Sequence, residues 1–370
     1  MNIFVNATAA DVGGLKSIVD HFLTHISKSE EENIYYIFVS NDHFNNFKSE
    51  KIKIINTNSK KWIKRLLWDS YGMKRWANKN NIIPDQIISL QNTAVNFKNV
   101  NQIIYLHTPI PFVEYEWKIT KKNERKLWFY KNIYPFFIKL FLNNNCSIVV
   151  QANWLKKRVS SRIKVSENRI FVIKPDFSLK QEDTDMLLNV DSNRRFSDQI
   201  SMFYPAIDYV YKNHLTILKA LKKLKDENIS LYQKLVFVIT VDEQSDTYKY
   251  AKKLGIHDAV KFLGKVPFSE IVKEYKRSNF VLFPSYIETA GLPLLEAAYF
   301  KKLIICSDEV YARELIGDYK GVHFTPALNV DEWKRKIEHH AEANIPLYEY
   351  TIDKSANSWD QLLKLVKKGD

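Results

Sequence analysis

The sequence predicts an α/β protein of two domains, each a mostly parallel β-sheet covered by helices on both faces. Short apolar segments rich in β-branched and aromatic residues alternate with longer segments of helical periodicity, as in parallel strands joined by crossover helices. At 370 residues the chain exceeds the size at which a single core keeps growing. A polar segment without apolar runs, residues 176–199, separates two such alternating regions.

The first domain is expected over residues 1–178. Its predicted strands are the apolar runs IFVNA, IYYIFV, KIKII, QIISL, QIIYL, SIVV and IFVIK, in chain order. Apolar residues at helical spacing fill much of the intervals between these runs, at 14–26, 60–80, 120–142 and 153–163. This alternation predicts one Rossmann-like domain.

The second domain is expected over residues 196–350, followed by an amphipathic C-terminal helix within residues 351–370. Its predicted strands are QISMFYP, KLVFVIT, VKFLG, NFVLFPS and KLIICS. Its predicted helices are 212–226, 246–254, 268–277, 293–300, 309–316 and 330–341. Two such sheets in series would place the carboxyl ends of their strands at an interdomain cleft, so we expect ligand-binding residues in loops that follow strands.

Composition limits the cellular setting. Cys146 and Cys306 lie far apart beside apolar runs, as expected for buried thiols in a reducing compartment. No run approaches the roughly 18 apolar residues of a membrane span, and the first residues lack the pattern of a secretory signal. We therefore expect a cytoplasmic protein.

The net charge of +13 is concentrated in two segments. Residues 60–80 and 118–139 each hold seven Lys or Arg and one acidic residue, interleaved with Trp, Tyr and Phe. Helices of this composition rest on anionic membranes, with aromatic rings at the headgroups and cations against the phosphates. Nucleic acid would suit the same charges, and solvated helix faces with aromatic residues packed inward would also explain them. The sequence leaves these three interpretations open.

The stretch FVLFPSYIETAGLPLLEAA places Glu288 and Glu296 on either side of a glycine-proline turn. Pro293 suits the start of a helix, whose free N–H groups can bind phosphate, and Gly291 would let the backbone approach a ligand closely. Carboxylates in such a place can accept hydrogen bonds from sugar hydroxyls. The alternative is that Glu296 is only a favourable charge in the first helical turn and Glu288 an exposed loop residue.

Other candidates lie at strand ends or helix starts. Gly13 and Gly14 follow the first strand, where their N–H groups could approach phosphates, although tight turns need glycine without any ligand. His107 follows the strand QIIYL, a position that alone is more often structural than functional. Lys212 begins a predicted helix and is either an exposed residue or a charge for a phosphate. The other histidines lack a metal-ligand pattern, and no Asp-x-Asp motif is present, so we expect no metal.

Several segments resemble retaining glycosyltransferases of family four, the E-x7-E enzymes with two facing Rossmann-like domains, known as the GT-B architecture. Their C-terminal signature resembles the segment PSYIETAGLPLLEAAYFKKLIICSD. The stretch before that signature resembles FLGKVPFSEIVKEYKRSNFVLFPS, and the start of their second domain resembles MFYPAIDYVYKNHLTILKAL. DVGGLKSIVDHF resembles their glycine loop, and YLHTPIPF a histidine loop of the subgroup that builds bacterial surface polysaccharides. The resemblance spans about residues 10–325.

The resemblance implies roles for the candidates. Glu296 would hold the ribose hydroxyls of a nucleotide, Glu288 would contact the transferred sugar, and Lys212 would neutralise the departing diphosphate. His107 would touch the sugar or the acceptor hydroxyl. The implied catalytic residues are His107, Lys212 and Glu288, and the implied donor-binding residues are Gly13, Gly14, Lys212, Glu288, Thr289, Ala290, Gly291, Leu292 and Glu296.

One departure from the family concerns the diphosphate. The family usually places an arginine a few residues before its lysine, whereas this chain reads PAIDYVY there. Arg194, Arg195 or a lysine from elsewhere would have to substitute for it.

The resemblance thus implies a retaining, metal-independent hexosyltransferase (EC 2.4.1.-) without a cofactor. It would move a sugar from a UDP or GDP donor to a hydroxyl of a lipid-linked glycan. The enzyme itself would bind peripherally at the inner face of the cytoplasmic membrane. The expected pathway is the assembly of lipopolysaccharide, O-antigen or capsule. Two alternatives are a sugar-nucleotide 2-epimerase of the same fold, which the E-x7-E pattern disfavours, and a basic nucleic-acid-binding protein, for which no module signature is found.

Overall fold

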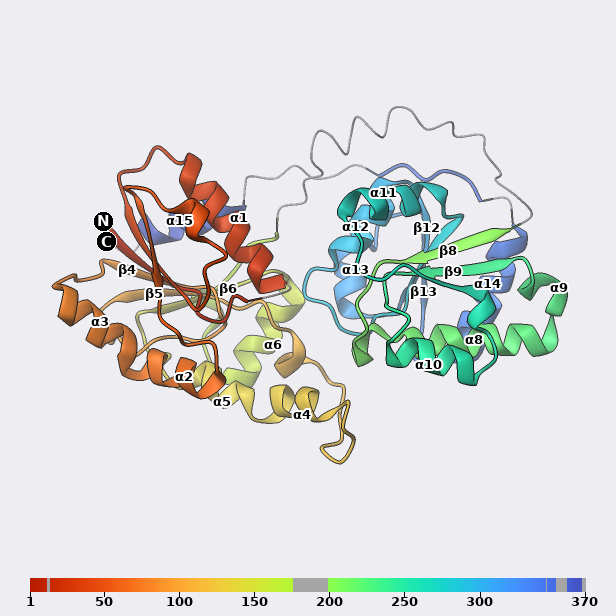
Figure 1. Ribbon diagram of the computed structural model, residues 1–370, viewed down its shortest axis with the longest axis horizontal. Coiled ribbons are helices and arrows are strands. Elements are labelled where there is room, and N and C mark those ends of the chain that lie inside the picture. Colours follow the sequence, from red (N-terminus) through yellow and green to blue (C-terminus); the bar gives the residue numbers. More distant parts are fainter. Residues whose placement is uncertain (12–13, 176–198, 344, 351–357, 368–370) are drawn as a thin grey trace. The chain divides into compact units, whose positions relative to one another are not determined.

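The computed structural model describes residues 1–11, 14–175, 199–343, 345–350 and 358–367 (Figure 1). The chain divides into two compact units. The first unit comprises Met1–Asp176 and Ser355–Asp370, and the second comprises Phe177–Lys354. Each unit holds one parallel sheet with helices on both sides, which confirms the predicted α/β class.

The first unit contains a seven-stranded sheet. Its strands are β1 (Asn2–Asn6), β2 (Ile34–Val39), β3 (Ile52–Asn56), β4 (Gln86–Ser89), β5 (Asn101–Tyr105), β6 (Cys146–Val150) and β7 (Ile170–Val172). They lie in the order β3-β2-β1-β4-β5-β6-β7, and every pair is parallel. The strand order reverses between β1 and β4, and such a switch point is where open α/β sheets bind ligands beyond the carboxyl ends of their strands.

Alternation along the strands separates the two faces of this sheet. Ile3 and Val5 of β1 pack into one apolar cluster, which includes helix α1 (Gly14–Lys28), while Phe4 packs into another on the opposite face. The C-terminal helix α15 (Ser358–Lys367) packs with α1, because Trp359 of α15 lies edge-on to Phe22 of α1 with ring centroids 5.3 Å apart. This helix therefore completes the core of the first unit although it follows the second unit in sequence.

The two predicted basic helices are each interrupted. Segment 60–80 forms α2, a π-helical turn and α3, and segment 120–142 forms two helices because Pro135 lacks an N–H to continue the first and occupies the start of the second. The helices of this part of the unit are α2 (Trp62–Leu67), η2 (Trp68–Gly72), α3 (Met73–Asn80), α4 (Arg125–Asn132), α5 (Tyr134–Lys139) and α6 (Asn153–Ile163). Short 3₁₀ turns lie at Asn45–Phe47, Ile110–Phe112 and Glu167–Arg169.

The second unit contains a six-stranded parallel sheet. Its strands are β8 (Ile200–Tyr204), β9 (Leu235–Ile239), β10 (Val260–Phe262), β11 (Phe280–Phe283), β12 (Leu303–Ser307) and β13 (Val322–Thr325). They lie in the order β10-β9-β8-β11-β12-β13, so the switch point lies between β8 and β11. The sequence did not predict β13, because its four residues, VHFT, are short and include a polar side chain in the middle.

Helices pack around this second sheet (Figure 1). They are α8 (His214–Glu227), α9 (Ile229–Tyr232), α10 (Asp246–Lys253), α11 (Phe268–Arg277), α12 (Leu292–Tyr299), α13 (Val310–Ile316) and α14 (Val330–Glu342), with 3₁₀ turns at Val210–Lys212 and His257–Ala259. Side chains cap three of them: Asn228 accepts from the N–H of Leu231 at the start of α9, Ser245 from the N–H of Tyr248 at the start of α10, and Asn329 from the N–H of Glu332 at the start of α14. Among the described residues, no helix combines the length and apolarity needed to cross a bilayer.

Candidate functional site

An ion pair lies beyond the carboxyl ends of β8 and β11, the two strands at the switch point of the second sheet. Lys212 follows β8 and Glu288 follows β11. The Lys212 ammonium donates a hydrogen bond to Glu288 Oε1, and each side chain remains 14% exposed. The fold thus brings together two of the residues that the sequence selected, at the edge where parallel sheets bind ligands.

The loop that carries Lys212 is fixed by Asn213. This asparagine adopts a left-handed conformation with φ of 59°, so α8 begins at His214 instead of at residue 212 as predicted. Asn213 Nδ2 donates to the carbonyl oxygens of Pro284 (3.0 Å) and Ala327 (2.7 Å). Lys212 consequently sits in a 3₁₀ turn just before the helix, with its backbone tied to the loop after β11.

The loop that carries Glu288 is held by Ser285 and its neighbours. Ser285 Oγ donates to Glu288 Oε1 at 2.8 Å, so the carboxylate has two donors, an ammonium and a hydroxyl. The N–H of Tyr286 donates to the carbonyl of Tyr211 at 3.0 Å, and the Tyr311 hydroxyl donates to the carbonyl of Ser285 at 2.6 Å. These contacts link the two loops of the switch point to each other.

The glycine-proline turn has the geometry that the sequence predicted. Gly291 has φ of +54°, and a Cβ there would lie 3.3 Å from Leu315 Cδ2, so the position favours glycine for both its conformation and its packing. Helix α12 begins at Leu292, with Pro293 in its second position. Pro293 has no N–H and the N–H of Leu294 donates to the carbonyl of Gly291 at 2.8 Å, so the N–H groups that this turn could offer an anion are those of residues 290–292.

Glu296 lies past the first turn of α12, and the alternative that it merely offsets the charge of the helix start is therefore wrong. Counting from Leu292 it is the fifth helical residue, and α12 has no acidic residue in its first turn. Tyr275 of α11 donates a hydrogen bond to Glu296 Oε2 at 2.9 Å. Burial raises the pKa of Glu296 to about 7, against which the Tyr275 hydrogen bond acts. This carboxyl group therefore titrates near neutral pH.

His107 lies in the first unit, where it follows β5. Asn92, in the loop after β4, accepts from the N–H groups of His107 (2.7 Å) and Thr108 (3.2 Å) through Oδ1. Its Nδ2 then faces His107 Nε2 at 3.2 Å, which makes Nε2 an acceptor. Burial lowers the pKa of His107 to about 4, so the imidazole is neutral at physiological pH.

The remaining predicted residues lie in other parts of the chain. Gly14 is the first residue of α1 in the first unit, and a Cβ there would meet nothing within 4 Å. Gly13 lies outside the described residues, as do Arg194 and Arg195, the two candidates for the missing arginine.

Two tyrosines occupy the loop in which the family usually has its arginine. Tyr209 and Tyr211 stack with ring centroids 5.4 Å apart and planes at 30°. Burial, followed by the charge of Glu288, raises the pKa of Tyr211, so its hydroxyl keeps its proton and can donate. The loop is anchored at Asp208, whose Oδ1 accepts from Thr247 Oγ1 at 2.6 Å.

Sequence reasoning missed the residues that support these side chains. Asn92 follows the predicted strand QIISL, and Ser285 is the last residue of the predicted strand NFVLFPS, so a systematic survey of polar residues at the ends of strands would have found them. Tyr275 lies within α11, where nothing in the sequence distinguishes it from a core tyrosine.

The comparisons with known proteins agree on the fold. Residues 189–357 match the model of a family described as glycosyl transferases group 1. No curated protein matches the chain. Among solved structures, WaaG, a glycosyltransferase involved in lipopolysaccharide biosynthesis, has a TM-score of 0.65 at 13% identity over 93% of this chain and 91% of that chain.

Two further structures show how widely this fold is used. Anabaena HepE in complex with UDP and glucose has a TM-score of 0.61 at 13% identity, covering 92% of this chain and 90% of that chain. The UDP-GlcNAc 2-epimerase from Methanocaldococcus jannaschii has a TM-score of 0.54 at 11% identity, covering 99% of each chain. The chain therefore has the GT-B fold of these enzymes, and the segment that includes its second sheet matches the glycosyl transferases group 1 family.

Proposed function

We propose that this protein is a retaining glycosyltransferase that moves a hexose from a nucleotide diphosphate to a hydroxyl of a lipid-linked glycan. The observation that carries the proposal is the Lys212–Glu288 pair at the switch point of a unit that matches the group 1 family. An epimerase shares the fold, so the fold alone does not decide the reaction. The UDP and glucose bound to HepE support a nucleotide-sugar donor.

Each part of the site has a task in donor binding. The Lys212 ammonium would move from Glu288 to the diphosphate, and Glu288, still held by Ser285, would then accept hydrogen bonds from the sugar hydroxyls. The N–H groups at the start of α12 would face the phosphates and the sugar. Glu296 would accept from the ribose hydroxyls, which favours its charged form.

The transfer step that we propose is the one that the resemblance to retaining glycosyltransferases implies. The acceptor oxygen forms a bond to the anomeric carbon on the face from which the diphosphate departs, as the bond between sugar and phosphate breaks. A phosphate oxygen takes the proton of the acceptor hydroxyl, and Lys212 and the N–H groups of residues 290–292 stabilise the negative charge that develops on the leaving group. The protein thus contributes positioning and charge, without a covalent intermediate on its own side chains.

A product assay tests this function. The protein is incubated with UDP- and GDP-hexoses, with and without lipid-linked saccharide acceptors, and the products are analysed by NMR. We expect nucleotide release only with an acceptor, and a product that keeps the anomeric configuration of the donor. Formation of a C2 epimer without an acceptor, or a product of inverted configuration, would contradict the proposal.

Metal removal should leave the activity unchanged. The positive charge opposite the diphosphate is supplied by Lys212 and the helix N–H groups, so we propose that no divalent cation is required. Initial rates after exhaustive treatment with EDTA should equal those of the untreated enzyme. A rate that disappears with EDTA and returns with added Mg²⁺ or Mn²⁺ would show that this part of the proposal is wrong.

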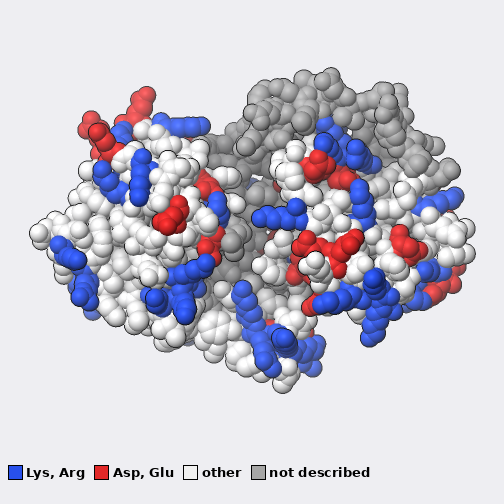
Figure 2. All heavy atoms as spheres, viewed as in Figure 1, with Lys and Arg blue, Asp and Glu red and all other residues white. Residues whose placement is uncertain are grey.

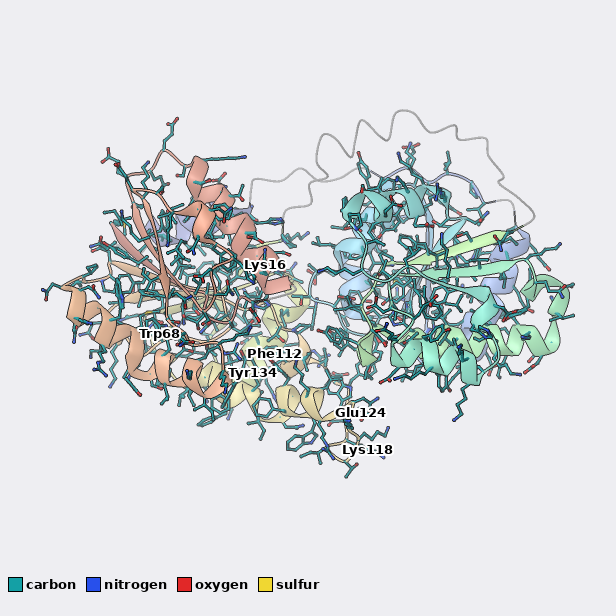
Figure 3. All side chains as sticks on the ribbon, viewed as in Figure 1. Lys16, Trp68, Phe112, Lys118, Glu124 and Tyr134 are labelled. Atoms are coloured by element: carbon teal, nitrogen blue, oxygen red, sulfur yellow. The ribbon has the colours of Figure 1, made fainter. Side chains whose placement is uncertain are left out.

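The two basic segments meet in one surface of the first unit. Trp62 at the start of α2 lies edge-on to Phe137 of α5 (ring centroids 4.4 Å) and to Phe129 of α4 (5.8 Å). On the same helices, Ile63 is 67% and Phe136 is 62% exposed. We call the surface formed by α2, α4 and α5, which includes the exposed Ile63 and Phe136, the basic aromatic surface. Lys and Arg side chains gather at the tip before α4 (Figure 2), where Lys118 and Glu124 lie (Figure 3).

We propose that the basic aromatic surface rests on an anionic membrane, where a lipid-linked acceptor is located. Exposed apolar side chains among cations are the combination that inserts at the headgroup boundary. Binding to vesicles that contain phosphatidylglycerol should exceed binding to phosphatidylcholine vesicles and decrease with added salt. The double variant Ile63→Ser/Phe136→Ser should weaken it, whereas Ile229→Ser, at a 50% exposed position in the second unit, should not. Equal binding to both vesicle types would contradict the proposal.

A further inference from the structure

A buried carboxylate in the first unit has no role in the transfer described above. Asp69 lies on η2, the π-helical turn between α2 and α3, and is only 7% exposed. Its neighbour Trp68, labelled in Figure 3, is buried as well. Because a π turn is wider than an α-helical turn, two consecutive side chains point in more similar directions. Gly72 permits this packing, because a Cβ at that position would lie 2.8 Å from Trp68 Cε3. Such turns are frequent at functional sites.

Asp69 joins the two strands at the switch point of the first sheet. Its Oδ1 accepts from Asn6 Nδ2 at 2.8 Å, and Asn6 is the last residue of β1. Asp69 Oδ1 also accepts from Gln91 Nε2 at 3.1 Å, and Asp69 Oδ2 accepts from Thr93 Oγ1 at 2.9 Å; both donors follow β4. A carboxylate taken out of water destabilises the fold unless such donors compensate it, and an apolar side chain would fill the space at lower cost.

The network continues beyond Asp69 through Gln91. Gln91 Oε1 accepts from Thr8 Oγ1 and from the N–H of Ala9, both at 3.0 Å, so the amide fixes the segment after β1. The next residue, Asn92, holds His107 through its side chain. One carboxylate therefore fixes the segments that follow β1 and β4 and, through the backbone beside Gln91, the support of His107.

We propose that Asp69 is a positioning residue, which through Gln91 holds the segment after β1 and the Asn92–His107 pair in the arrangement that the first unit presents to the sugar acceptor. The inference rests on the proposed function, because only that function assigns an acceptor to the first unit. Asp69 itself is buried and touches no substrate.

Kinetics of Asp69→Asn test this role, because the substitution keeps the shape but replaces one of the two oxygens that accept from the three donors with an NH2 group, which cannot accept. We expect kcat to fall about tenfold or more while the KM of the nucleotide sugar stays within about twofold, since misplacement acts on the reacting geometry, and Lys212, Glu288 and Glu296, to which the proposed function assigns the donor contacts, lie in the second unit. Gln91→Met, which removes the link to Thr8 and Ala9, should have the same effect. The matched control is Asp85→Asn, at the opposite end of β1, where Asp85 accepts from the N–H of Asn2 at 2.6 Å.

Amide hydrogen exchange provides a readout that needs no substrate. In the ligand-free protein, residues 7–10 and 90–94 should exchange faster in Asp69→Asn and Gln91→Met than in the wild type, and Asp85→Asn should not change them. If wild-type protein transfers no sugar, the proposed function fails, and exchange still decides whether Asp69 fixes these segments. Should Asp69→Asn not fold, Thr93→Val, which removes one of its donors, replaces it. Wild-type kcat together with wild-type exchange in the Asp69 or Gln91 variant would overturn the inference.

Discussion

Replacing Lys212 with alanine should lower kcat for sugar transfer by about two to three decades, because one charged contact to a developing oxyanion contributes about 3 kcal/mol. The ammonium sits beyond β8 and is one of two donors to Glu288. Without it, the departing diphosphate loses its point charge. Initial rates at saturating donor and acceptor measure the effect, and circular dichroism verifies that the fold is retained.

A second lysine of the same region provides the matched control. Lys222, on α8, forms an exposed pair with Asp226, four residues later, so Lys222→Ala should keep the wild-type rate. Lys212→Arg keeps the charge and should retain more activity than Lys212→Ala. Wild-type kcat in Lys212→Ala would show that the ammonium does not act on the leaving group.

Glu296→Gln should weaken donor binding by about ten- to a hundredfold, because a hydrogen bond to a charged group contributes about 1.5–3 kcal/mol. Glutamine keeps the shape of the side chain and an oxygen to accept from Tyr275, so the fold should be unaffected. The measurement is the dissociation constant of the nucleotide sugar. Glu270→Gln, at an exposed ion pair on α11, is the control and should bind the donor like the wild type.

The same residue predicts a pH dependence. Burial raises the pKa of Glu296 to about 7, so in the free enzyme the carboxyl group is protonated below that pH and cannot accept from both ribose hydroxyls. We expect kcat/KM for the donor to fall as the pH decreases through about 7, because this ratio reports the free enzyme, and Glu296→Gln should lose that dependence. If kcat/KM falls in the same way with decreasing pH in the wild type and in Glu296→Gln, the titrating group is not Glu296.

The raised pKa of Glu296 also determines how the stability of the folded protein changes with pH. The unfolded chain releases this proton near 4.5, the group's ordinary pKa, whereas the folded protein keeps it up to about 7. The contribution of Glu296 to stability is therefore complete at acid pH and lost as the pH rises through that range. The melting temperature of Glu296→Gln, measured relative to that of the wild type, should thus increase as the pH rises.

The strands were predictable because their signal is local. All seven strands of the first sheet were identified from runs of β-branched and aromatic residues, and a parallel sheet buried on both faces needs such runs. The edge strand β13 was missed because VHFT lacks that pattern. Lys212, Glu288 and the turn at Gly291 were identified because they follow strands or begin a helix.

The supporting side chains were not predictable, since their roles arise from tertiary contacts. In the sequence, Asp69 is the single acidic residue of a basic segment and resembles a surface countercharge. In the structure, the π turn buries it at the carboxyl ends of β1 and β4. Tyr275 reaches Glu296 from a neighbouring helix, and Trp62 of α2 contacts Phe129 of α4 and Phe137 of α5, which lie 67 and 75 residues later in the sequence. No periodicity or motif encodes contacts at this separation.

The most direct test of the central claim is a titration with nucleotides. Isothermal calorimetry compares UDP with UMP and GDP with GMP, in wild type and in Lys212→Ala. We expect the wild type to bind one diphosphate more tightly than its monophosphate, and Lys212→Ala to lose that preference. A wild type that binds none of the four, or a variant that keeps the full preference for the diphosphate, would contradict the claim that this site holds a sugar nucleotide by its diphosphate.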